Sequence, residues 1–193
     1  MAKPYKLALS QIVKDEAHVI ERMLNTIKNI VDCIVIVDTG STDGTQDIIK
    51  KFGQDNNIPT YVFERPFDDF EKSRNHAMEM ARQMVDKQGW KREETWTHWL
   101  DADETLIVDK SFDKRKIDKD LYMINTFIGN MKYTRNTFGR TSKPFKWYGP
   151  VHEFIICDDQ NISSGLMEGC HVDVKMIGAS WKGNIADKYK KHS

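Results

Sequence analysis

Apolar and polar residues alternate in two different ways along this chain, and the change comes after about one hundred residues. In the first part, apolar runs at 7–13, 33–38, 60–63 and 96–100 predict strands. Each of the first three runs is followed by a segment with apolar residues at helical spacing, which predicts a helix. The second predicted helix covers residues 45–52 and the third covers residues 70–85. Because strands that alternate with helices form parallel sheets with crossover helices, this part predicts an α/β fold with a mostly parallel sheet.

The first predicted helix has an apolar face made of Ile20, Met23, Leu24, Ile27 and Val31. Asp15 precedes this helix, and aspartate is one of the residue types that cap helix N-termini. We therefore expect Asp15 to cap it.

The second part lacks helical patterns between its strands. Residues 109–120 are charged and loop-like, and runs at 121–128, 131–138 and 152–157 predict strands that follow one another directly. This order favours a mixed or antiparallel arrangement of strands. We expect residues 1–193 to form one domain, and the unfinished helical pattern at the end is typical of the N-terminal domain of a longer chain.

Charge and composition narrow the possible classes of function. The 29 basic and 29 acidic residues cancel, which argues against general binding to nucleic acid or to an anionic membrane. No apolar run is long enough to span a membrane and the N-terminus lacks the apolar core of a signal peptide, so we expect a cytoplasmic protein. Cys33, Cys157 and Cys170 are far apart in the sequence and are expected to be reduced thiols.

Three polar clusters follow predicted strands, at residues 14–16, 38–44 and 101–104. In open parallel sheets, ligands bind beyond the carboxyl ends of the strands. Although the clusters are separate in the sequence, we expect them to converge on one site.

The cluster at 101–104, Asp-Ala-Asp-Glu, predicts a site for a divalent cation. Two carboxylates so close together repel each other, and a bound hard cation relieves the repulsion. Mg²⁺ or Mn²⁺ held by Asp101 and Asp103 would keep coordination positions open for diphosphate oxygens. A D-x-D triplet alone is also compatible with a solvated acidic turn.

Asp38 ends a run that reads as a buried strand, where a carboxylate needs a partner. It can accept a hydrogen bond from a nucleobase imide or a ribose hydroxyl, or it can bond the amides of the next loop. That loop lacks both the Walker spacing and the G-x-G-x-x-G fingerprint, which does not support ATP-type or dinucleotide binding. Arg74 lies in the first turns of the third predicted helix and can reach a phosphate or a base, although a surface ion pair is the plainer interpretation.

The segment at 147–153, Trp-Tyr-Gly-Pro-Val-His-Glu, combines aromatic side chains with two residues that can act chemically. His152 can bind a metal or a phosphate, and Glu153 can take a proton from an attacking hydroxyl. His171 and Asp173 are weaker candidates for the same roles, which are binding of a metal or phosphate and acceptance of the proton. The alternative is an aromatic core patch with a surface His-Glu pair.

Taken together, these blocks resemble the family-2 glycosyltransferases of the GT-A fold. The resemblance covers about residues 5–155 and lies in five blocks in family order, L-S-Q-I-V-K-D-E at 9–16, I-V-D-T-G-S-T-D-G-T at 36–45, K-S-R-N-H-A at 72–77, W-L-D-A-D-E at 99–104 and W-Y-G-P-V-H-E at 147–153. The last block is most similar to that of compact bacterial and large-DNA-virus members. For a viral protein, the expected cytoplasm would be that of the host.

The resemblance implies a nucleotide diphosphate-sugar donor, usually UDP-linked, a glycan or glycoprotein acceptor, and Mn²⁺ or Mg²⁺ at the D-x-D motif. It implies that residues 1–104 bind the donor and residues 105–193 face the acceptor. The donor-binding residues that it implies are Val13, Asp15, Glu16, Asp38, Arg74, Asp101 and Ala102.

Within this set, Asp103 would be the principal metal ligand, Asp101 would contact ribose or metal, and Asp38 would hold the uracil. Relatives often have a further histidine-glycine block where this chain has Met176-Ile-Gly178, so His152 or His171 would be the late metal ligand. If the reaction inverts the sugar, Glu153 is the first candidate for the base and Asp173 the second.

Three other classes of protein stay open at this point. Residues 101–105 also match the D-x-D-x-T motif of haloacid-dehalogenase-like phosphatases, although that motif usually lies on the first strand and three predicted strands precede it here. A nucleotidylyltransferase would share the architecture but should have a glycine-rich basic segment near its N-terminus. A carbohydrate-binding module would bind glycans without metal or nucleotide.

Overall fold

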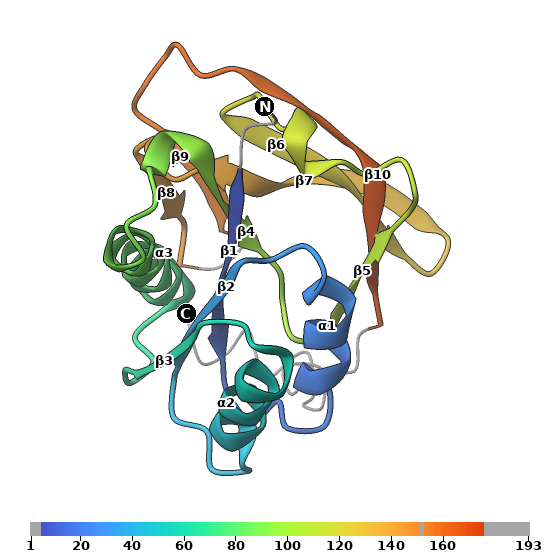
Figure 1. Cartoon of the computed structure of the whole chain (residues 1–193). Helices are drawn as coiled ribbons and strands as arrows, with labels where there is room; N and C mark the ends of the chain where they lie inside the picture. Colours follow the sequence, from blue (N-terminus) through green and yellow to red (C-terminus); the bar gives the residue numbers. More distant parts are fainter. Residues whose placement is uncertain (1–4, 151–152, 176–193) are drawn as a thin grey trace.

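The computed structural model describes residues 5–150 and 153–175, which form a mixed α/β fold (Figure 1). Its helices are α1 (Ile20–Ile27), α2 (Thr45–Asn56) and α3 (Phe70–Lys87), with short 3-10 turns at Arg92–Glu94 and Lys114–Lys116. Its strands are β1 (Lys6–Val13), β2 (Cys33–Asp38), β3 (Thr60–Glu64), β4 (Thr95–Trp99), β5 (Glu104–Val108), β6 (Leu121–Ile128), β7 (Met131–Arg140), β8 (Phe145–Tyr148), β9 (Phe154–Cys157) and β10 (Ser164–Val174).

Eight of these strands form one sheet in the order β3-β2-β1-β4-β7-β6-β10-β5. The neighbours β3, β2, β1 and β4 are parallel. Beyond β4 the sheet is mixed, because β7 is antiparallel to both β4 and β6, β10 is parallel to β6, and β5 is antiparallel to β10. The predicted fold class, a mostly parallel sheet with a mixed second part, is confirmed.

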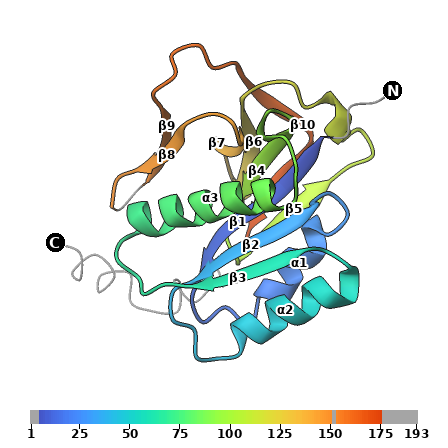
Figure 2. The ribbon, with the colours of Figure 1, turned by 60° about the vertical axis from the view of Figure 1, so that its left-hand side comes forward.

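Helices cover both faces of the parallel part of the sheet (Figure 2). All six residues of β2 are buried, as the apolar run predicted. Ile34 and Ile36 belong to the core shared with α1 and α2, whereas Cys33 and Val35 pack with residues of α3. Side chains that alternate between the two faces of a strand explain this division.

The strands β8 and β9 form a separate antiparallel hairpin, in which Trp147 pairs with Ile155 and Tyr148 with Phe154. The hairpin lies beside the first half of α3 (Figure 2). It therefore brings residues 147–149 close to the carboxyl end of the parallel strands.

The expected cap of the first helix is wrong. α1 begins after Val19, and no side chain caps its N-terminus. Asp15 has a left-handed backbone with φ of 53° and lies four residues before the helix cap, so its carboxylate binds the loop after β2 instead. None of the helices in the described ranges combines the length and apolarity needed to cross a membrane. The three cysteines are free, as expected.

Candidate functional site

The loops that follow β1 and β2 are hydrogen-bonded to each other. The Asp15 amide donates to Ser41 Oγ at 2.9 Å, and the Thr42 amide donates to Asp15 Oδ1 at 2.8 Å. The Glu16 amide donates to Thr45 Oγ1 at 2.9 Å. The structure thus brings together the first two predicted clusters.

Asp38 lies at the end of β2, is fully buried, and pairs in register with Val13 of β1. Its Oδ1 atom accepts hydrogen bonds from the amides of Gly40 at 2.9 Å and Ser41 at 2.8 Å. Its Oδ2 atom is buried and has no hydrogen-bond partner in the part of the chain that the structure describes. Because an unsatisfied buried carboxylate oxygen is costly, Oδ2 is suited to accept a hydrogen bond from a bound group.

The loop between β4 and β5 carries Asp101, Ala102 and Asp103. The Asp101 side chain is 38% exposed, whereas Ala102 is buried in the core and Asp103 is nearly buried. The Asp103 carbonyl accepts a hydrogen bond from Arg22 Nη2 at 2.7 Å, which ties the loop to α1. Of the two carboxylates, that of Asp101 therefore has the greater access to solvent.

Arg74 of α3 connects this loop to the segment after β8. Its Nη2 atom donates to Asp101 Oδ1 at 3.0 Å and its Nε atom donates to Glu153 Oε1 at 2.8 Å. Its guanidinium carbon lies 5.0 Å from the centre of the Trp147 ring. Burial alone would lower the pKa of Arg74, but the charges of Asp101 and Glu153 raise it above its ordinary value. Arg74, Asp101 and Glu153 thus form one group of contacts.

Two residues of α3, Asn75 and Glu71, attach the hairpin to this helix, and neither role was predicted from the sequence. Asn75 Nδ2 donates to the Trp147 carbonyl at 2.8 Å, and its Oδ1 accepts from the Trp147 amide at 2.9 Å. Glu71 Oε2 accepts from the Gly149 amide at 2.7 Å. Both residues lie in or beside the K-S-R-N-H-A block, whose polar residues at helical spacing were the available signal.

Arg135 of β7 was also missed. It forms an ion pair with Glu104, whose side chain is only 4% exposed. Burial and the nearby charge of Asp101 raise the pKa of Glu104, and Arg135 opposes this rise. A lone arginine inside a strand pattern carries no distinctive sequence signal.

The other candidates, His171, Asp173 and His152, have other contacts or lie outside the described ranges. Asp173 of β10 is next to His171, with 3.9 Å between His171 Nε2 and Asp173 Oδ1, and its other ion-pair partner among residues 5–150 and 153–175 is Lys175. Asp173 pairs in register with Thr105 of β5, at the far edge of the sheet from β1. His152 lies outside the described residues.

The donor set at this loop fits a hard divalent cation in part. Within the described ranges, no three His, Cys, Asp or Glu side chains are grouped closely enough to hold a metal ion by themselves. The loop offers the carboxylates of Asp101 and Asp103, and Mg²⁺ sites commonly combine one or two carboxylates with phosphate oxygens and water. The residues therefore fit a cation that a diphosphate helps to bind.

The curated proteins that are similar to this chain include two from bacteria. A TPR repeat-containing protein of Synechococcus elongatus is 28% identical over 158 residues, which are 78% of this chain and 35% of that protein. The SPbeta prophage-derived glycosyltransferase SunS of Bacillus subtilis is 27% identical over 152 residues, 74% of this chain and 33% of that protein. The chain thus spans about a third of the length of these relatives.

Solved structures with a similar arrangement include S. aureus TarS in complex with UDP, with a TM-score of 0.47 and 18% identity over 65% of this chain and 36% of that one. Another is glucosyl-3-phosphoglycerate synthase of Mycobacterium tuberculosis with Mn²⁺, UDP and phosphoglyceric acid, with a TM-score of 0.41 and 13% identity over 66% of this chain and 44% of that one. The family model for glycosyl transferase family 2 matches residues 12–157, which is most of this chain and includes the last four of the five blocks and most of the first. The chain belongs to glycosyl transferase family 2.

Proposed function

We propose that this chain is a metal-dependent glycosyltransferase that moves a sugar from a UDP-sugar to a hydroxyl of a glycan or glycoprotein acceptor. The observation that carries the proposal is the pair of ion contacts by which Arg74 joins Asp101 of the D-x-D loop to Glu153. A cationic side chain between two carboxylates, on a helix that borders the carboxyl ends of parallel strands, suits a diphosphate leaving group and an acceptor hydroxyl. Family membership and the similarity to SunS, a glycosyltransferase, support the same class of reaction.

The donor base would bind between the loops after β1 and β2. Uracil has an imide N–H flanked by two carbonyl oxygens, so it needs an acceptor at the imide. The unpartnered Oδ2 of Asp38 supplies that acceptor, because Oδ1 is already engaged by Gly40 and Ser41. The backbone at Val13, Asp15 and Glu16 would then border the base.

Asp101 and Asp103 would hold Mn²⁺ or Mg²⁺ together with the donor diphosphate, with His152 as a further candidate ligand. A cation bound there stabilises the negative charge that develops on the departing diphosphate. Arg74 would also stabilise the negative charge on the diphosphate, because its guanidinium contacts the Asp101 carboxylate and can donate to a phosphate oxygen.

Glu153 would act as the base of an inverting reaction. The acceptor oxygen forms its bond to the anomeric carbon while the bond to the diphosphate breaks, and the hydroxyl proton passes to the Glu153 carboxylate. Arg74 Nε holds one oxygen of this carboxylate, Oε1, at 2.8 Å. Asp173 is the second candidate for the base.

Calorimetry of UDP binding, with and without Mn²⁺, tests the donor site. We expect wild-type protein to bind UDP more tightly with Mn²⁺, and Asp103→Asn to lose that difference. The matched control is Asp158→Asn, which removes an acidic side chain that is 70% exposed on the β9 side of the molecule. Metal-dependent UDP binding by Asp103→Asn equal to wild type would refute the assignment of the metal ligand.

Turnover of a UDP-sugar tests the base. Glu153→Gln should keep UDP affinity and lose roughly a hundredfold or more in turnover, within the usual contribution of a general base. Asp173→Asn serves as the comparison, because its side chain has the other partners described above. If Glu153→Gln turns over normally and Asp173→Asn does not, the roles of the two carboxylates are reversed.

A further inference from the structure

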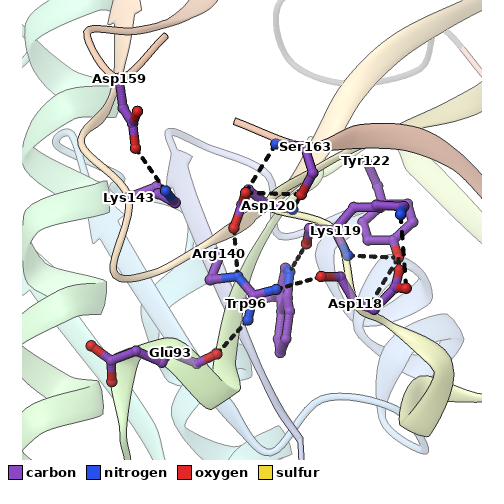
Figure 3. A network of polar contacts seen from close by, with 10 residues as sticks. All are labelled: Glu93, Trp96, Asp118, Lys119, Asp120, Tyr122, Arg140, Lys143, Asp159 and Ser163. Atoms are coloured by element: carbon purple, nitrogen blue, oxygen red, sulfur yellow. Dashed lines mark hydrogen bonds and ion pairs between the residues drawn. The ribbon is translucent and has the colours of Figure 1, made fainter. Parts of the chain in front are cut away.

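Two arginines of β7, Arg135 in the middle of the strand and Arg140 at its C-terminal end, each form an ion pair with a poorly exposed carboxylate. Arg140 pairs with Asp120, with 2.7 Å between Nε and Oδ1, and its guanidinium carbon lies 4.2 Å from the centre of the Trp96 ring (Figure 3). Asp120 also accepts from the Ser163 amide at 3.0 Å. Because Arg140 pairs in register with Trp96 near the start of β4, this network lies at the opposite end of β4 from the D-x-D loop.

Arg135 lies five residues before Arg140, in the middle of β7, and reaches the D-x-D loop. Its Nη2 atom contacts Glu104 Oε2, and the same oxygen accepts a hydrogen bond from the Asp101 amide at 2.8 Å. The Glu104 amide in turn donates to the Asp101 carbonyl at 3.1 Å. The chain of contacts therefore runs from β7 through the Glu104 side chain to the backbone of Asp101.

The charges around this loop explain why Arg135 is needed. The loop has three carboxylates within four residues, and that of Glu104 is almost fully buried. A buried carboxylate next to other carboxylates is stable only with a cation at contact distance. Without Arg135, the Glu104 carboxylate would lose the cation that holds it beside the Asp101 amide.

We propose that Arg135 is a positioning residue that holds Glu104 against the backbone of Asp101 and thereby sets the direction of the Asp101 and Asp103 side chains. Glu104 is a support of the loop in this arrangement and is not a metal ligand. Arg22 supports the same loop from α1 through the Asp103 carbonyl. The effect on the donor rests on the proposed function, whereas the effect on the loop does not.

A comparison of Arg135→Met with Arg140→Met tests the proposal. Both variants remove an arginine from the same strand and leave one poorly exposed carboxylate without its partner, so both should lower the melting temperature. Only Arg135→Met should weaken UDP binding with Mn²⁺, by about tenfold or more, which corresponds to about 1.4 kcal/mol. Equal UDP affinity of the two variants would overturn the positioning role.

A second substitution at Glu104 separates positioning from general destabilisation. In the double variant Glu104→Gln/Arg135→Met, no buried charge is left unpaired, and the glutamine oxygen can still accept from the Asp101 amide. We expect this variant to regain both melting temperature and UDP affinity relative to Arg135→Met. Recovery of the melting temperature without any recovery of affinity would contradict the proposed link through Glu104.

The Asp101 amide gives a measurement that is independent of the donor. Its hydrogen bond to Glu104 should slow its exchange with solvent in the wild type and in Arg140→Met, and exchange should become faster in Arg135→Met. If the wild type binds no nucleotide, the proposed function fails, and this exchange measurement still decides whether Arg135 orders the loop. Unchanged exchange at Asp101 in Arg135→Met would overturn the proposal.

Discussion

At the scale of single residues, the site depends on side chains that use their two polar ends for different partners. Asp38 orders its own loop with Oδ1 and keeps Oδ2 without a partner in the described part of the chain. Arg74 gives Nε to Glu153 and Nη2 to Asp101. Asp38 thus uses one oxygen for the loop and can offer the other to a ligand, whereas Arg74 uses both groups to join two carboxylates of the protein. A substitution that keeps one of the two polar groups is therefore the most informative.

Asp38→Asn keeps one oxygen and replaces the other with an amino group. The remaining oxygen can still accept from Gly40 and Ser41, so the loop should hold. A donor now faces the uracil imide, and UDP affinity should fall by about tenfold or more. Cytosine has an acceptor at the same position, so the ratio of UDP to CDP affinity, measured by calorimetry, should fall as well. An unchanged ratio would show that Asp38 does not contact the base.

His98 makes the free energy of unfolding depend on pH. It is fully buried, its Nδ1 lies 3.0 Å from the Thr137 carbonyl, and its ring stacks on Phe138. Burial lowers its pKa to about 4, so the folded protein keeps the ring neutral while the unfolded chain takes up a proton near its ordinary value of about 6.5. Stability is therefore complete above about pH 6.5 and falls as the pH decreases towards 4, by up to about 3 kcal/mol.

Urea unfolding at a series of pH values measures this loss. His98→Asn keeps a donor for the Thr137 carbonyl but does not titrate, so its stability should depend less on pH across this window. A wild-type profile that is parallel to that of the variant would assign the acid sensitivity to other groups.

At the scale of elements, α3 has two functions in the site. Its buried side contributes Ala77, Ala81 and Val85 to the core, as the helical spacing predicted. Its first half carries Glu71, Arg74 and Asn75, which contact the β8–β9 hairpin or the residue before β9. The helix begins at an effective cap, because Asp69 Oδ1 accepts from the Lys72 amide at 2.7 Å.

Asn75→Ala tests whether this attachment of the hairpin matters for the acceptor. The variant leaves the amide and carbonyl of Trp147 without two hydrogen bonds, which should loosen the hairpin while the loops after β1 and β2 stay intact. We expect UDP affinity within about twofold of wild type and a loss of about tenfold in kcat/KM for the acceptor. Asn56→Ala is the matched control, because the Asn56 side chain donates to the Phe52 carbonyl within α2. A fall in UDP affinity with no change in turnover would contradict the expectation that the attachment of the hairpin affects the acceptor and not the donor.

Elements in which apolar residues recur at a regular spacing could be predicted from the sequence, and elements with an irregular spacing could not. The boundaries of β2 and the start of α3 agree with the sequence expectation, because an unbroken apolar run and an aspartate cap are local signals. β5, β8 and β10 were missed. β10 contains Gly169 with φ of 75° and a shift of register between Leu166 and His171, which breaks the alternation of apolar residues.

The candidate site was predictable where it lies at the carboxyl ends of strands. Asp38 is the last residue of β2 and Asp101 lies just after β4, and both strands are parallel to β1. Because parallel strands have their carboxyl ends on the same side of the sheet, topology alone predicted that these two residues lie at that side. The contacts of Arg135 and Asn75 depend on long-range packing between β7, β8 and the loop, for which the sequence has no local signal. The cap at Asp15 failed for the same reason, because its partner Thr42 is 27 residues away.

At the scale of the whole molecule, the parallel strands of the first part and the mixed strands of the second part share one sheet. β4, which leads into Asp101, pairs with β7 at Trp96–Arg140, Thr97–Gly139 and His98–Phe138. The chain then crosses to β5 at the far edge of the sheet, next to β10. The loop at 101–104 therefore connects two regions of one sheet, and its conformation should respond to both.

This arrangement predicts that a ligand at the donor site stabilises both parts together. UDP with Mn²⁺ at about one hundred times its dissociation constant should add about 2.7 kcal/mol to the free energy of unfolding. For a chain of this size, that corresponds to a rise in melting temperature of about 5–10 °C in a single transition. Hydrogen exchange should then slow in β6 and β7 as well as in β1 and β2, since a shared sheet opens as one unit. Slower exchange confined to β1 and β2, or a second transition that UDP does not shift, would show that the two parts unfold independently and that the loop does not couple them.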